Sequence, residues 1–180
     1  MTEEEIRYSI EKNEVKLTFW EKLNHYGIVG FQLLIEGFYL YGFVRDHLNN
    51  PLKSSDELLV WVFIILTIIP FLTYLLLRHR LKFKSIETGL KRSELNDIIR
   101  RTGIGYKWTL LTVNDYCIVA KTNPRYFPVS RGERITIIFE QNKVFINSIS
   151  DPVKSSPLLS FGQNRRNVNR LIEGIKRGTY

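Results

Sequence analysis

Two long apolar runs occupy the first half of the chain, separated by a polar connection. Residues 58–77 (LLVWVFIILTIIPFLTYLLL) contain no charged side chain in 20 positions, and a helix of that length spans about 30 Å, the hydrocarbon thickness of a bilayer. Residues 26–44 (YGIVGFQLLIEGFYLYGFV) are less uniform because they include Gln32 and Glu36. The pattern predicts a two-helix transmembrane hairpin. The alternative is that residues 26–44 lie flat on the membrane surface or fold onto the soluble part.

The second half alternates between short strand patterns and two amphipathic helix patterns. The strand patterns cover residues 82–88, 108–113, 116–121, 135–139 and 144–149. Asn114-Asp115 and Gln141-Asn142 lie between consecutive strands and predict two hairpins. The helix patterns cover residues 90–102 and 164–176. This order predicts an α+β fold, a small antiparallel sheet with both helices packed on one face.

These patterns divide the chain into an N-terminal segment (residues 1–25), a hairpin (26–77, with spans 26–44 and 58–77) and a domain (78–180). The net charge is +8. Residues 78–180 carry 20 Lys and Arg against 8 Asp and Glu, a net +12. Basic residues concentrate on the cytoplasmic side of membrane spans, and a cluster directly follows the second run: Arg78, Arg80, Lys82 and Lys84. We therefore expect a multi-pass protein of the inner (cytoplasmic) membrane with both termini cytoplasmic, its basic domain facing anionic membrane lipids.

The first apolar run has its own polar and small-residue pattern. At 100° per residue, Gln32 and Glu36 lie on one stripe, whereas Gly30 and Gly37 lie on another. Small residues let membrane helices approach closely, and intramembrane carboxylates usually face a protein interior. The pattern predicts a membrane interface formed by these four residues and hence a homo-oligomer. The alternative is a lone hairpin with Glu36 protonated or snorkelling.

Residues for catalysis or metal binding are sparse. The three histidines, His25, His47 and His79, all flank the apolar runs, and the single cysteine, Cys117, lies within a strand pattern where a small core residue is expected. The sequence lacks Walker, GxSxG and HExxH motifs. It also lacks zinc spacings and the aromatic signatures of RNA-binding modules. We predict no enzyme activity, no metal site, no cofactor and no nucleic-acid partner.

The strongest binding candidate precedes the last helix pattern, in the run SFGQNRRN. A helix start, a glycine that permits close approach and adjacent arginines suit an anion. We therefore predict a ligand site at Gly162, Asn164, Arg165 and Arg166. Further donors would come from Arg131 and Arg134, with Lys121 and Arg125, if the loop of residues 122–133 folds over the same end of the sheet. The alternative is that Asn164 caps the helix and the arginines are solvated.

Three short runs together resemble a known pattern. They are SRGERITI at 130–137, NS at 147–148 with DP at 151–152, and SFGQN at 160–164 with Asn167. This tail pattern resembles an uncharacterised group of small bacterial proteins found in Bacteroidetes, in which an aromatic residue often stands where this chain has Arg131. The resemblance covers about residues 80–176 and implies a fold. Separately, two spans plus a small cytoplasmic domain is similar in layout to membrane effectors of CBASS and type III CRISPR antiphage systems, which respond to cyclic nucleotides.

The sequence thus favours a membrane effector whose basic domain senses an anionic small-molecule ligand, such as a nucleotide second messenger, and acts through an oligomeric hairpin. The alternative is a membrane-anchored scaffold or accessory subunit that binds a protein partner. Convergent arginines in a cleft would favour the first function. An exposed apolar patch would favour the second.

Overall fold

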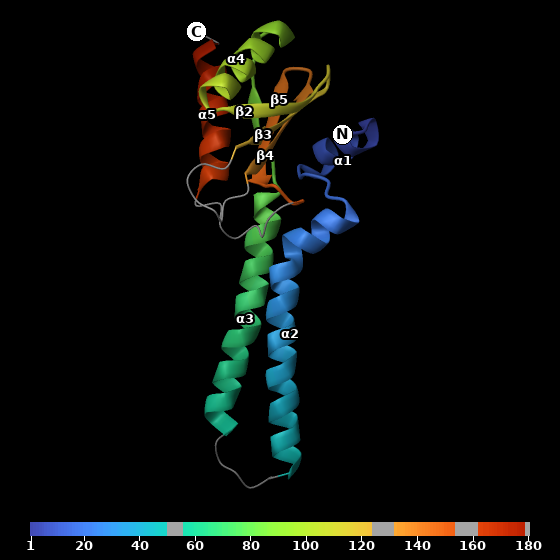
Figure 1. Cartoon of the computed structure of the whole chain (residues 1–180), viewed down its shortest axis with the longest axis vertical. Coiled ribbons are helices and arrows are strands. Elements are labelled where there is room, and N and C mark those ends of the chain that lie inside the picture. Colours follow the sequence, from blue (N-terminus) through green and yellow to red (C-terminus); the bar gives the residue numbers. More distant parts are fainter. Residues whose placement is uncertain (50–55, 124–131, 154–161, 179–180) are drawn as a thin grey trace.

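A computed structural model describes residues 1–49, 56–123, 132–153 and 162–178 (Figure 1). The chain forms a sheet domain from which two long helices project side by side. In chain order the elements are α1 (Glu3–Lys12), α2 (Phe19–Asn49), α3 (Asp56–Arg80), β1 (Lys84–Glu87), α4 (Arg92–Gly105), β2 (Trp108–Val113), β3 (Cys117–Thr122), β4 (Glu133–Glu140), β5 (Lys143–Ser150) and α5 (Gln163–Gly178).

The predicted α+β fold with an antiparallel sheet is confirmed. The five strands lie in the order β1-β5-β4-β3-β2, and every neighbouring pair is antiparallel. Both predicted hairpins are present, as the β2–β3 and β4–β5 pairs. Across the central strands, Ile118 on β3 lies opposite Ile137 on β4, which lies opposite Ile146 on β5. This register places apolar side chains in a row across the sheet, since alternate residues share a face.

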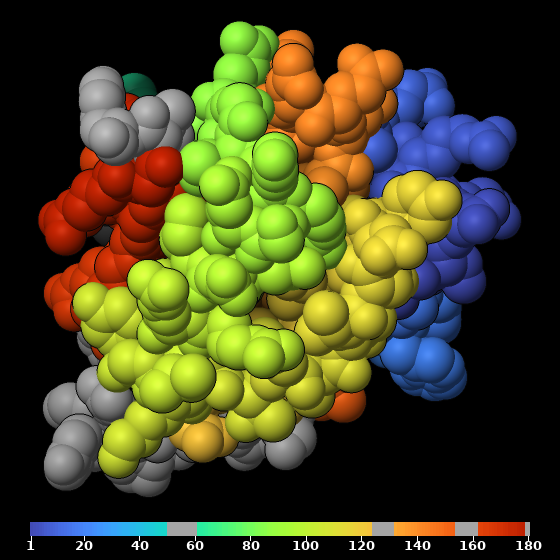
Figure 2. Space-filling model, turned by 90° about the horizontal axis from the view of Figure 1, so that it is seen from above, coloured from blue at the N-terminus to red at the C-terminus, as the bar shows by residue number. Residues whose placement is uncertain are grey.

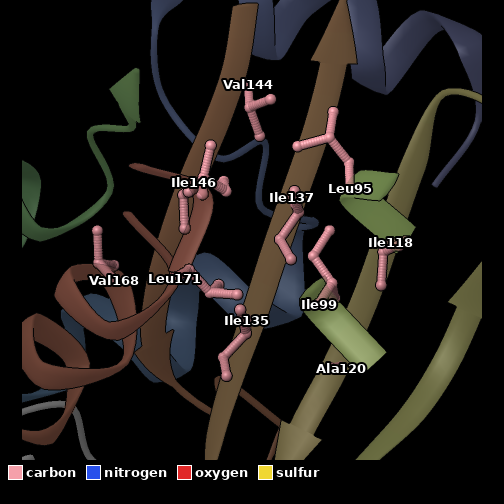
Figure 3. Close-up of a cluster of buried hydrophobic side chains, with 11 residues drawn as sticks. Leu95, Ile99, Ile118, Ala120, Ile135, Ile137, Val144, Ile146, Val168 and Leu171 are labelled. Atoms are coloured by element: carbon pink, nitrogen blue, oxygen red, sulfur yellow. The ribbon is translucent and has the colours of Figure 1, made fainter. Parts of the chain in front are cut away.

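One face of the sheet is covered by α4 and α5, as the amphipathic patterns predicted. Figure 3 shows side chains of the two helices converging on the central strands. The buried cluster consists of Leu95, Ile99, Ile118, Ala120, Ile135, Ile137, Val144, Ile146, Val168, Leu171 and Ile175. Ile135, Ile137, Ile146, Leu171 and Ile175 are fully buried, so this cluster is the main source of the hydrophobic stabilisation of the domain.

The N-terminal segment packs against the opposite face, an arrangement that the sequence patterns did not predict. Thr2 and Glu5 form a capping box at the start of α1. The following segment pairs with the chain beyond α3, because the amide of Val15 donates to the carbonyl of Leu81 at 2.9 Å. A second buried cluster results, formed by Ile6, Val15, Leu17, Leu81, Phe83, Cys117, Ile138 and Ile149. Cys117 therefore is a core residue, as expected.

Seen along the long axis, α5 and the N-terminal segment lie on opposite sides of the molecule, with α4 between α5 and the β2–β3 hairpin (Figure 2). The sheet is thus sandwiched between unlike layers. A side chain on the face covered by α4 and α5 therefore cannot contact a side chain on the face covered by the N-terminal segment.

The two long helices are long and apolar enough to cross a membrane. They pack on each other and stand away from the sheet domain (Figure 1). In their most apolar windows only 6% of α2 and 11% of α3 is buried, so neither resembles the core helix of a globular domain. The first extends beyond the predicted span of residues 26–44 at both ends, since α2 runs from Phe19 to Asn49. Its first turns therefore belong to the predicted N-terminal segment of residues 1–25.

Candidate functional site

The start of α5 is tied to the sheet by its asparagines. The side-chain amide of Asn167 donates to the hydroxyl of Ser148 on β5 at 3.2 Å, and that hydroxyl donates to Asn164 at 3.4 Å. Gly162 has a φ of +77°, a conformation that glycine adopts without strain, and its carbonyl accepts from the amide of Arg166 at 3.1 Å. The asparagines thus fix the first turn of the helix.

The two predicted ligand-binding arginines on this turn, Arg165 and Arg166, are exposed. Both side chains are accessible to an anion from solvent. Of their predicted companions in the preceding loop, Arg125 and Arg131 lie outside the described residues.

The remaining predicted donors lie on the other face of the sheet. Arg134 forms an ion pair with Glu21 of α2. Lys121, its register partner on β3, forms an ion pair with Asp151. Strand alternation places both side chains opposite to Ile135 and Ala120, which face α4 and α5. The structure therefore separates Arg134 and Lys121 from Arg165 and Arg166, and engages both in internal ion pairs.

This second face carries a set of polar contacts between the sheet and the base of the two long helices, which we call the hairpin junction. It is defined by Glu21, Asn24 and His25 on α2 and by Arg134 and Asn147 on the sheet. Beside the Glu21–Arg134 ion pair, the amide of Asn24 donates to the carbonyl of Pro152 at 3.1 Å. The amide of Asn147 donates to the carbonyls of Arg80 at 3.0 Å and Lys82 at 2.8 Å. The junction therefore connects both long helices to β4 and β5.

Several polar groups of the hairpin junction are buried. Asn147 is 3% exposed and His25 is 1% exposed, and the Nε2 atom of His25 lies 3.2 Å from the carbonyl of Leu77 on α3. That contact requires the proton on Nε2 because a carbonyl can only accept. Within the described residues, Nδ1 of His25, Nε of Arg134 and Oδ1 of Asn147 are buried without a hydrogen-bond partner. Displacing the helices would unmake the partnered contacts, and buried polar groups are costly to leave unpaired.

The predicted membrane-interface residues divide into two groups. Glu36 is 9% exposed and hydrogen-bonds to Thr67 of α3, so its partner lies within the same chain. Gln32 is half-buried. By contrast, Gly30 and Gly37 are exposed, and a Cβ atom added at either would meet nothing within 4 Å. The glycines therefore present a smooth surface to the outside of the hairpin.

An exposed apolar patch lies at the edge of the sheet, on β2 and the turn that follows. Leu111, Val113 and Tyr116 are 57%, 54% and 59% exposed, and Leu110 is 37% exposed. Among the strands that the structure describes, β2 is at the edge of the sheet and pairs only with β3. The register with β3 shifts at Leu111. We call these four residues the β2 edge patch.

Sequence reasoning missed the hairpin junction and the docking of the N-terminal segment. One signal for the start of α2 was present, since Thr18 and Glu21 form a capping box that begins with the pattern Thr-x-x-Glu. No local pattern indicates that Glu21 also pairs with Arg134. Comparison with known protein families, curated proteins and solved structures gives no match.

Proposed function

We propose that the chain is a two-span membrane effector whose cytoplasmic domain senses an anionic ligand and passes this event to the membrane hairpin. The hairpin junction is the observation that carries the proposal. The expected cluster of convergent arginines does not, because Arg134 lies on the opposite face of the sheet from Arg165 and Arg166. It links the sheet to both membrane helices through partly or fully buried polar contacts, so a change in the domain is transmitted to the hairpin as a rigid displacement.

The long helices support membrane insertion through their exposed surfaces. Large apolar side chains face outward along their length, including Phe38 at 77%, Phe71 at 60% and Trp61 at 59% exposure. In water this surface would far exceed the apolar patch of a typical soluble protein. The basic cluster beginning at Arg78 favours a cytoplasmic sheet domain. Because α1 packs on the same domain, the N-terminus lies on that side as well.

Self-association would use the glycine surface of α2. Gly30 and Gly37 lie within one 60° sector of the helix, whereas Gly42 lies on a different face. Leucine at Gly30 and Gly37 would keep two hairpins apart, because close helix approach depends on small residues. We expect Gly30→Leu with Gly37→Leu to reduce the oligomer measured by light scattering in detergent, whereas Gly42→Leu leaves it unchanged. Equal oligomer sizes in the wild type, in the double variant and in Gly42→Leu would refute this interface.

The ligand would bind at the first turn of α5, where Arg165 and Arg166 are exposed. Each charge-assisted contact contributes about 1.5–3 kcal/mol, so losing two should weaken binding at least about a hundredfold. The test is a thermal-shift and calorimetry screen of the full chain in detergent against cyclic oligonucleotides, nucleotides and headgroup phosphates. A ligand that stabilises the wild type but not Arg165→Ala with Arg166→Ala supports the proposal. No binder, or equal binding by both proteins, refutes it.

The β2 edge patch favours a second function, a membrane-anchored scaffold. An unpaired edge strand with apolar side chains accepts an extended strand from a partner protein. Leu111→Lys should block such a partner while leaving the fold intact, since Leu111 is mostly exposed. The test is crosslinking from position 113, in place of Val113. Stoichiometric crosslinking to one defined protein that is lost in Leu111→Lys, but kept in the control Arg100→Gln, would favour the scaffold. Unchanged crosslinking in Leu111→Lys would exclude it.

A further inference from the structure

A groove of about 410 Å³ opens between the N-terminal segment and the base of the two long helices. Unlike the surface of the hairpin, its lining combines aromatic and basic side chains. The residues that matter here are Tyr8 and Lys16 from the N-terminal segment, Lys22 and Tyr26 from α2, and Tyr74 and Arg78 from α3. The groove thus exists only because the N-terminal segment folds back beside the hairpin.

The charges that line the groove favour an anion. Lys22 and Arg78 are exposed, and neither forms an ion pair within the described parts of the chain. Lys16 bonds to Glu4 at 2.9 Å and lies 5.5 Å from the centre of the Tyr8 ring. Two basic side chains are therefore available to a ligand, and the third is held in place on the groove wall.

Among the described residues that line the groove, Glu14 is the one acidic residue, and it is already engaged. The hydroxyl of Tyr8 donates to the carboxylate of Glu14 at 3.1 Å, and this bond raises the pKa of Tyr8 above its ordinary value. Glu14 is also fixed by an isolated backbone bridge to Lys82. The basic side chains of the groove therefore outnumber its carboxylates, and the excess lies on the hairpin side.

The position of the groove along the hairpin indicates what kind of anion it would meet. Tyr26 and Tyr74 lie at the cytoplasmic ends of the predicted spans, and their ring centres are 5.5 Å apart. Amphipathic rings are enriched at this depth of a membrane. Lys22 and Arg78 lie one turn further out, about 6 Å along the helix axis. This is the depth of the lipid phosphates, just outside the hydrocarbon.

We propose that this groove binds a phosphate group. Lys22 and Arg78 would be the charged contacts of the phosphate, and Tyr26 and Tyr74 are the aromatic residues that line the groove beside them. The phosphate would come from the headgroup of an anionic phospholipid of the cytoplasmic leaflet or from a soluble phosphate compound. The lipid source rests on the proposed membrane location. In either case the bound phosphate would join the bases of α2 and α3, beside the hairpin junction.

The experiment is native mass spectrometry of the full chain in detergent, titrated with dioleoylphosphatidylglycerol, with dioleoylphosphatidylcholine or with inorganic phosphate. The test variant is Lys22→Gln with Arg78→Gln. The control is Arg100→Gln with Arg101→Gln, which removes the same charge from exposed positions on α4, at the end of the molecule away from the hairpin (Figure 1). A charge-preserving variant, Lys22→Arg with Arg78→Lys, checks that any loss is not caused by misfolding.

We expect one saturable phosphatidylglycerol site, weakened about 30-fold in the groove variant, because each basic residue near a membrane surface contributes about fivefold. The control and the charge-preserving variant should bind within threefold of the wild type. Displacement of the lipid by inorganic phosphate would assign the site to soluble phosphates, and resistance to displacement would assign it to lipid. Equal binding of both lipids, or equal losses in test and control variants, would overturn the proposal.

Failure of this inference and failure of the proposed function give different results. If the protein is not in a membrane, the phosphate titration still reports on the groove. If the protein is in a membrane but shows no groove-dependent site, only this inference is lost.

Discussion

The ion pair between Glu21 and Arg134 should contribute a measurable coupling energy, because it fastens α2 to the sheet. The side chains are 13% and 20% exposed. Fully exposed pairs contribute about 0–1 kcal/mol, whereas removing one partner of a buried pair costs about 3–5 kcal/mol. The Glu21–Arg134 pair lies between these limits, and a hydrogen bond to a charged group contributes about 1.5–3 kcal/mol. We therefore expect a coupling energy of about 2 kcal/mol.

A double-mutant cycle isolates this value. Glu21→Gln is suitable because glutamine can keep the capping box with Thr18, so the variant loses the charge but not the helix cap. The partner change is Arg134→Gln. Either single variant should lower the melting temperature by about 4–8 °C for a chain of this size, and the double variant should lose little more. The assay is thermal unfolding of the full chain in detergent, followed by circular dichroism.

The matched control is the exposed cross-strand pair of Glu87 and Lys143, whose side chains are 76% and 53% exposed and lie 3.4 Å apart. Its cycle, made with the same glutamine substitutions, should give a coupling energy below about 1 kcal/mol. If Glu21 and Arg134 also behave additively, the ion pair does not hold the hairpin to the sheet, and the reasoning about the junction fails.

Three further predictions concern the core, a glycine with a positive φ and the two long apolar helices. Ile137→Ala should cost about 2–5 kcal/mol in thermal unfolding, because Ile137 is fully buried, and a loss below 1 kcal/mol would contradict its central place. Gly132→Ala should destabilise by at least about 1–2 kcal/mol, since its φ is +93° and the new Cβ would lie 2.5 Å from the carbonyl oxygen of Thr122. Gly105→Ala, in open space, is the control, and equal melting temperatures would refute the strain. Glu36→Leu should increase insertion of α2 in a translocon assay by about 3 kcal/mol, and unchanged insertion would place Glu36 outside the hydrocarbon.

The parts of the fold predicted from the sequence are those determined by local patterns. The amphipathic stripe of α5, with Val168, Leu171 and Ile175, is buried as expected. The β-hairpins follow from turn pairs flanked by apolar strands, since turn residues and alternation act over a few neighbours. The two apolar helices follow from the length and composition of the two runs, because about 20 consecutive apolar residues are typical of a membrane-spanning helix.

The parts that were missed depend on contacts between distant segments. Glu21 and Arg134 are 113 residues apart in the chain, and Asn24 and Pro152 are 128 residues apart. No local periodicity records such a pairing. For the same reason the sequence grouped Arg134 with Arg165, although strand alternation and the order of the strands place them on opposite sides of the sheet. Thr67 of the same hairpin is the hydrogen-bond partner of Glu36, and the homo-oligomer stays a prediction.

The central claim is that the two long helices cross a membrane and hold the sheet domain on its cytoplasmic side. Single cysteines introduced in a Cys117→Ala background test it most directly, with Ser54→Cys between the helices in sequence and Ser93→Cys on the exposed surface of α4. With a membrane-impermeant maleimide on intact spheroplasts, the account predicts labelling of Ser54→Cys at once and of Ser93→Cys only after permeabilisation. Labelling of Ser93→Cys from outside, or of Ser54→Cys only from the cytoplasmic side, would contradict it.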